Sequence, residues 1–190
     1  MKNINHGIKV SKQGFNVLNA DSERTDKPRN NSSLPYLLYA LALPYLLGAK
    51  KQVERYQVAT LALKERPVNG VYECLHEAST LFEDLCTVGK YAEKCGNKNE
   101  LHQLWFDVRN HIRHDVREEY DNEADSRKNK RAERLKLDPK LQTNIGFTVD
   151  AIKVGGTVIE IRQINSYLEW AEGIITDILN EAKKQGYLRT

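Results

Sequence analysis

Four stretches of the chain carry apolar residues at intervals of three and four, and this period constrains the fold more than any other feature. Residues spaced in this way fall on one face of an α-helix. We expect helices at residues 34–65, 69–94, 99–121 and 164–184, with Pro44 kinking or splitting the first. The sequence therefore predicts a mainly α protein, and 190 residues are enough for one domain with a substantial core.

The segment before the last helix has a different pattern, in which apolar residues alternate at intervals of two. Ile145 and Phe147 follow this period, and further apolar residues lie on both sides of Gly155 and Gly156. Alternation of this kind indicates short strands, and adjacent glycines favour a turn. We predict a small β-hairpin at about residues 144–162, with the glycines as a turn rather than a phosphate-binding loop.

The N-terminal residues 1–33 are polar and contain one short apolar alternation. We interpret them as a flexible arm with room for one short strand or hairpin, and residues 34–190 as a single helical domain. The arm lacks the apolar core of a secretory signal, and the three cysteines lack the paired spacing of a zinc site. We therefore expect free thiols and a cytoplasmic protein.

Residues 34–49 are free of charge but are shorter than the roughly 20 residues that a membrane span needs. They also contain Pro35 and Pro44, which a regular spanning helix would have to accommodate. We interpret this stretch as a buried core helix and predict no membrane association. Contact with a membrane or with a partner protein is the alternative.

The motif at residues 109–114, Arg-Asn-His-Ile-Arg-His, lies within the third predicted helix. At about 100° per residue, Trp105, Val108 and Ile112 belong to the apolar stripe of this helix, and His111 lies on its flank. The side chains on a different arc are Phe106, Arg109, Asn110, Arg113 and His114. The helix therefore has a second organised face.

This second face carries residue types that can cleave RNA without a metal. Arginine holds the charge of a phosphate, and histidine transfers protons near neutral pH. We assign His114 as the candidate catalytic acid or base, Arg109 as the phosphate clamp and Asn110 as a polar positioning group. Arg113, one turn from Arg109, would add affinity for the RNA phosphates, and no cofactor is expected.

Residues 122–137 form a basic segment with almost no apolar side chains, which predicts a solvated loop or a frayed helical extension. Because the segment follows the motif closely, we expect Arg127, Lys128, Lys130 and Arg131 to bind RNA, with a purely solvated segment as the alternative. Basic residues without interleaved aromatic residues contact the backbone and read no bases. The segment would supply affinity only.

The stretch LWFDVRNHIRHDVREE resembles the signature of the HEPN superfamily, small helical domains with an Arg and a His separated by four to six residues. Here the pair is Arg109 and His114, and the resemblance covers roughly residues 34–187. It implies an antiparallel bundle of four to five helices, and a homodimer in which two motifs form a composite active site. It further implies a metal-independent endoribonuclease acting on RNA as a toxin or antiviral defence effector, with an antitoxin or regulatory protein as a further partner. One departure is Val116, where related toxins often have a modified tyrosine.

Two alternatives accompany this interpretation. Members of the superfamily can keep the fold and lose activity, so the chain would then be an inactive HEPN-like module that binds nucleic acid or a protein. In that case the motif would form a solvated face or a dimer contact, with ion pairs to Asp107 or Glu118. The second alternative is a helix-borne metal site at His111, His114, Asp115 and Glu118, but a convincing complete ligand set is missing and we predict no metal.

Overall fold

The residues that the computed structural model describes are 34–63, 65–116, 124–140 and 144–186. Residues 34–40 and 114–116 are described by their backbone alone, and the arm predicted at residues 1–33 lies outside the described part of the chain. The elements are α2 (Leu34–Ala62), α3 (Pro67–Lys94), α4 (Leu101–Asn110), the π-helical turn η2 (His111–Val116), α5 (Asp125–Leu135), β1 (Ile145–Thr148), β2 (Ala151–Val154), β3 (Thr157–Glu160) and α6 (Ile161–Lys184). The predicted mainly α fold is confirmed.

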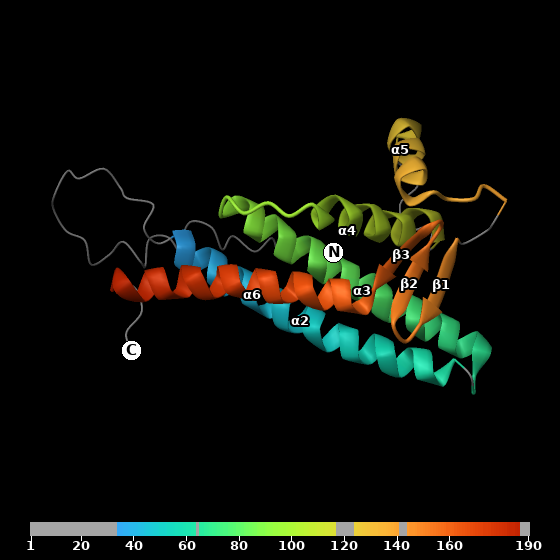
Figure 1. Ribbon diagram of the computed structural model, residues 1–190, viewed down its shortest axis with the longest axis horizontal. Helices are drawn as coiled ribbons and strands as arrows, with labels where there is room; N and C mark the ends of the chain where they lie inside the picture. The colour runs from blue at the N-terminus through green and yellow to red at the C-terminus, as the bar shows by residue number, and fades with distance from the viewer. Residues whose placement is uncertain (1–33, 64, 117–123, 141–143, 187–190) are drawn as a thin grey trace, which may run out of the picture. The chain divides into compact units, whose positions relative to one another are not determined.

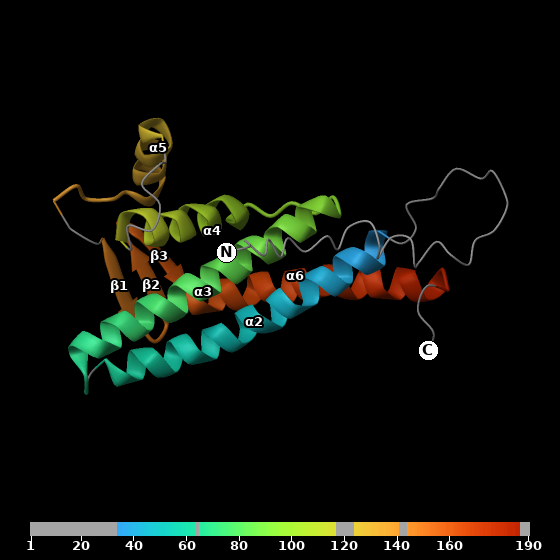
Figure 2. The same ribbon diagram turned by 180° about the vertical axis from the view of Figure 1, so that it is seen from behind.

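Helices α2, α3 and α6 pack side by side and α4 lies along α3, with successive helices running in opposite directions (Figure 1, Figure 2). Their apolar faces share one core, in which the Trp105 ring packs against Phe82 and Tyr167 with centroid distances of 5.7 and 5.6 Å. Gly48 on α2 leaves room for the Asp84 carboxylate of α3, because a Cβ atom at Gly48 would lie 2.6 Å from Asp84 Oδ2. The helical part is an antiparallel bundle.

Helix α2 runs through Pro44 without being split, so of the two predicted effects of this proline, a kink or a split, the split is wrong. A proline inside a helix removes one backbone hydrogen bond, but Ala42, Leu46 and Ala49 stay buried on both sides of it. Their burial holds one face of the helix against the core. Leu41, Tyr45 and Leu47 are 42%, 40% and 55% exposed, so the predicted core helix is buried on one face and not all round. None of the helices in the described residues has a run long and apolar enough to cross a membrane.

The three strands form an antiparallel sheet in the order β1-β2-β3, with Ile152 opposite Ile159 at its centre. The predicted hairpin is present as β2 and β3, which are joined by the glycine turn. β1 adds a third strand on the other side of β2, because the alternating apolar pattern begins before β2. Tyr56 on α2 connects the bundle to this sheet. Its hydroxyl donates to the carbonyl oxygens of Thr148 and Ala151, each at 2.9 Å.

Gly155 and Gly156 form the turn between β2 and β3, as the sequence predicts. Gly155 has a φ of 58°, and a Cβ atom on it would lie 2.5 Å from the carbonyl oxygen of Leu135. The Gly155 N–H donates to the Asn144 carbonyl at 2.7 Å, and the Gly156 N–H donates to the Lys136 carbonyl at 3.0 Å. Both amides are thus used within the chain rather than held open for a phosphate.

For residues 122–137 the sequence left a solvated loop and a helical extension open, and the solvated loop is wrong for the central part, because Asp125–Leu135 form the helix α5. Leu135 is fully buried and anchors the end of this helix in the core. Asp125 in the first turn and Arg134 in the last turn also complement the helix dipole. One apolar anchor and two favourable end charges stabilise a helix that has no continuous apolar stripe.

Candidate functional site

The helix that carries the motif changes its winding inside the motif. Helix α4 ends at Asn110, and the next six residues form the π-helical turn η2. Such turns are rare and are frequent at functional sites. Each residue of a π-helix rotates the chain by less than the roughly 100° of an α-helix, so the backbone of residue 114 lies nearer the Arg109 side than a regular helix would place it. The His114 side chain itself, the candidate acid or base, lies outside the described residues.

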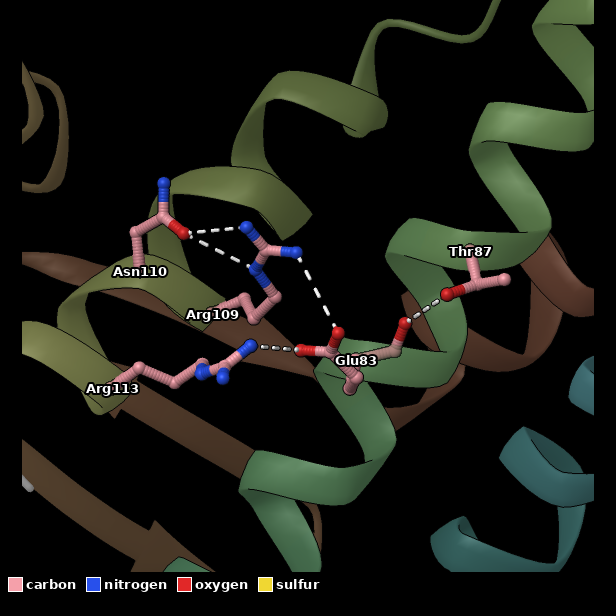
Figure 3. A network of polar contacts seen from close by, with 5 residues as sticks. All are labelled: Glu83, Thr87, Arg109, Asn110 and Arg113. Atoms are coloured by element: carbon pink, nitrogen blue, oxygen red, sulfur yellow. Dashed lines mark hydrogen bonds and ion pairs between the residues drawn. The ribbon is translucent and has the colours of Figure 1, made fainter. Parts of the chain in front are cut away.

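The Arg109 guanidinium is held by the residue that directly follows it. Asn110 Oδ1 accepts hydrogen bonds from Arg109 Nε at 3.1 Å and from Arg109 Nη2 at 2.8 Å (Figure 3). Asn110 is only 6% exposed, which corrects the prediction that it points away from the core. Helix α5 packs against α4, and a wheel drawn for a single helix does not include such a neighbour. Asn110 therefore orients Arg109 from a buried position.

Glu83 on α3 faces both arginines of the motif from across the helix pair (Figure 3). Its Oε1 atom lies 3.7 Å from Arg109 Nη1, and its Oε2 atom lies 3.2 Å from Arg113 Nη1. This carboxylate precedes Arg113 by 30 residues and could not be found from the sequence, because no spacing rule connects residues on different helices. Asp107, which the alternative interpretation gave with Glu118 as a possible partner of the motif, is bound to Arg134 of α5.

A groove between α3 and α4 lies beside these residues. Its lining includes Cys86, Lys90, Glu93, His102, Phe106 and Arg109. Phe106 is 47% exposed, and its ring centroid lies 4.8 Å from Arg109 Cζ, a cation–π distance. His102 Nδ1 lies 3.0 Å from Glu93 Oε1, so the groove also contains a histidine that the sequence analysis did not select. The sequence did contain a signal for His102, because it precedes Arg109 by seven residues, which places the two side chains on the same face of one helix.

The chemistry of the groove excludes a cysteine nucleophile at Cys86. Burial raises the pKa of Cys86 to about 12, and the nearby Glu83 carboxylate adds to this although Arg109 opposes it. The thiol is therefore protonated near neutral pH and is a poor nucleophile. Within the described residues no three side chains of metal-binding type come together. Of the residues in the metal alternative, His111 is buried, and the side chains of His114, Asp115 and Glu118 lie outside the described part of the chain.

Helix α5 presents some of the predicted basic residues to solvent. Arg127 and Lys130 are exposed and Lys128 is half-buried. Arg131 is only 2% exposed, which corrects its assignment to an RNA-binding surface. Arg131 and Leu135 lie four residues apart on the buried side of α5, so only the other side of the helix can meet a large ligand.

No model of a known protein family matches the chain, and neither the curated proteins nor the solved structures give a significant match. A functional assignment therefore rests on the side chains around Arg109.

Proposed function

We propose that the chain is a HEPN-type, metal-independent endoribonuclease that acts as a toxin or antiviral defence effector. The observation that carries the proposal is the arrangement of Arg109. Its guanidinium is fixed by two hydrogen bonds that it donates to Asn110, the residue that follows it in the motif, and it lines an open groove. A preorganised guanidinium of this kind is suited to stabilising charge on a phosphate.

In the proposed reaction, a base removes the proton of a ribose 2′-OH, the 2′-oxygen attacks the adjacent phosphorus, and the 5′-oxygen leaves with a proton from an acid. His114 is assigned to one of these proton transfers. Arg109 neutralises charge on the non-bridging oxygens, and Asn110 holds Arg109 in place. The products are a 2′,3′-cyclic phosphate and a 5′-hydroxyl.

A second copy of the chain would complete the site. The reaction needs two proton transfers and the motif offers one assigned histidine, so two motifs meeting across a two-fold axis would supply both. RNA is the substrate in this proposal, and an antitoxin or regulatory protein is a further partner. The exposed Arg127 and Lys130 on α5 would add affinity for the RNA backbone.

The proposal is tested with purified protein and a labelled single-stranded RNA in EDTA. We expect cleavage that leaves a 2′,3′-cyclic phosphate, and no cleavage of the matching DNA, which lacks the 2′-OH. His114→Ala and Arg109→Ala should each lower the rate by at least about 100-fold. The matched control is His76→Ala, because His76 is exposed on α3 outside the groove lining.

Equal cleavage by the wild type, His114→Ala and Arg109→Ala would contradict the proposal, because the activity would then come from a contaminant or from another site. One observation favours a second candidate, an inactive module that binds nucleic acid or a protein. Arg109 and Arg113 are both paired with Glu83, as in a structural contact. Retained RNA binding without any cleavage by the wild type would select this second candidate.

A further inference from the structure

Arg109 has one guanidinium edge left for an anion. A guanidinium offers its N–H groups along two edges, each of which can hold two oxygen atoms or bind one oxygen in a fork. The Nε and Nη2 edge of Arg109 is occupied by Asn110 Oδ1. The remaining edge includes Nη1, the atom that faces Glu83 Oε1 at 3.7 Å (Figure 3).

The Glu83 carboxylate occupies the position of a bridging anion between the two arginines. One oxygen faces Arg109 Nη1 and the other, at 3.2 Å, faces Arg113 Nη1. Two non-bridging oxygens of a phosphate diester would present the same charge and a similar pair of acceptors. The Glu83 side chain is 46% exposed, so it can turn into solvent without leaving a buried charge.

We propose that Glu83 is a built-in competitor for the phosphate site of Arg109 and Arg113, which an RNA phosphate must displace. The choice of RNA as the ligand rests on the proposed function. Displacement leaves Arg109 oriented, because the two hydrogen bonds that Arg109 donates to Asn110 do not involve Glu83. The carboxylate therefore sets the affinity of the site for phosphate by competition and does not hold the arginine in its working position.

The test measures binding of a fluorescent single-stranded 2′-O-methyl RNA, which contains phosphates and cannot be cleaved through a 2′-OH. Glu83→Gln keeps the shape of the side chain and removes its charge. We expect this variant to bind the RNA about five-fold more tightly than the wild type at low salt, the size of effect that partly exposed ion pairs produce. In an Arg109→Ala/Arg113→Ala background the same substitution should change the affinity by less than about two-fold.

The matched control is Glu93→Gln, which removes the same charge from the same helix and groove but is paired with His102. Tighter binding by Glu83→Gln alone supports the inference. Unchanged or weaker binding by Glu83→Gln overturns it, and so does an equal gain in both variants, because the effect would then come from net charge. Binding too weak to measure in every variant also overturns it.

Failure of the inference and failure of the proposed function give different results. The 2′-O-methyl RNA reports phosphate binding alone, whereas cleavage of ordinary RNA by the wild type and by His114→Ala reports the reaction. Tighter RNA binding by Glu83→Gln without any cleavage by the wild type would support the phosphate site and contradict the ribonuclease proposal. Cleavage by the wild type together with an unchanged RNA affinity of Glu83→Gln would support the ribonuclease proposal and contradict the role of Glu83 as a competitor.

Discussion

Asp107 binds Arg134 through two parallel hydrogen bonds, from Nε to Oδ2 at 2.5 Å and from Nη2 to Oδ1 at 2.6 Å. Asp107 is buried and also accepts a hydrogen bond from Gln103 at 3.0 Å. The hydrogen bond to Asp107 raises the pKa of Arg134. This contact joins the motif-bearing α4 to the basic α5 and brings the basic helix beside the candidate site.

Arg134→Gln should lower the free energy of unfolding by about 2 kcal/mol, because it leaves the buried Asp107 carboxylate without its cation. Urea unfolding followed by circular dichroism measures the change. The control is Arg162→Gln, whose ion pair with Glu160 is exposed and should contribute less than about 1 kcal/mol. Equal effects of the two substitutions would show that the Asp107 contact does not anchor α5.

Tyr56→Phe should lower the free energy of unfolding by about 1 kcal/mol, because the Thr148 and Ala151 carbonyls lose their shared donor. The substitution leaves the buried ring in place, so the loss reports the hydroxyl alone. Tyr72→Phe is the control, since Tyr72 is 70% exposed and its loss of a hydroxyl should change stability by less than about 0.5 kcal/mol. Thermal unfolding of both variants compares them, and a neutral Tyr56→Phe would contradict the predicted tie between α2 and the sheet.

Asp84 should make the protein less stable as the pH rises from about 4 to about 6. Burial, with a smaller contribution from Glu83, raises the pKa of Asp84 to about 6, above the roughly 3.9 of an unfolded chain. The folded state therefore binds the proton more tightly, and this stabilisation is complete below pH 4 and lost above pH 6.

Asp84→Asn should consequently raise the free energy of unfolding at pH 7 by about 1 kcal/mol, after allowance for solvent screening. At pH 4 the difference from the wild type should be close to zero. Urea unfolding at four pH values measures both effects, with the exposed Asp177→Asn as the control. A gain that is the same at pH 4 and pH 7 would contradict the assignment to Asp84 ionisation.

Two glycine substitutions should change stability in opposite directions. Gly155→Ala places a Cβ atom 2.5 Å from the Leu135 carbonyl oxygen on a residue with a φ of 58°, so we expect a loss of about 3 kcal/mol. Gly173→Ala lies inside α6 with no atom within 4 Å of its Cβ position, and we expect a gain of about 0.5–1 kcal/mol. Melting temperatures should separate the pair, and a tolerated Gly155→Ala would contradict the close approach at the turn.

The sequence alone predicted the mainly α fold, because the periods of three to four and of two depend on residues near one another in the chain. It placed Trp105, Val108 and Ile112 on the buried face of the motif helix, where all three are buried. It also placed the turn at Gly155, where the backbone conformation favours glycine. The catalytic residues predicted from the sequence all lie in one motif for the same reason, because a motif is defined by the spacing of residues within one helix.

The tertiary structure decided which of those side chains are accessible and what they contact. The segment at residues 122–137 has no apolar stripe, and the burial of Leu135 and the bond from Arg134 to Asp107 stabilise its central part as a helix. The same packing buries Arg131, which the sequence had placed on a basic surface. Glu83 joins the motif because α3 lies against α4 and brings its carboxylate to both arginines. These outcomes depend on contacts between residues distant in the chain, and the period of a sequence carries no information about them.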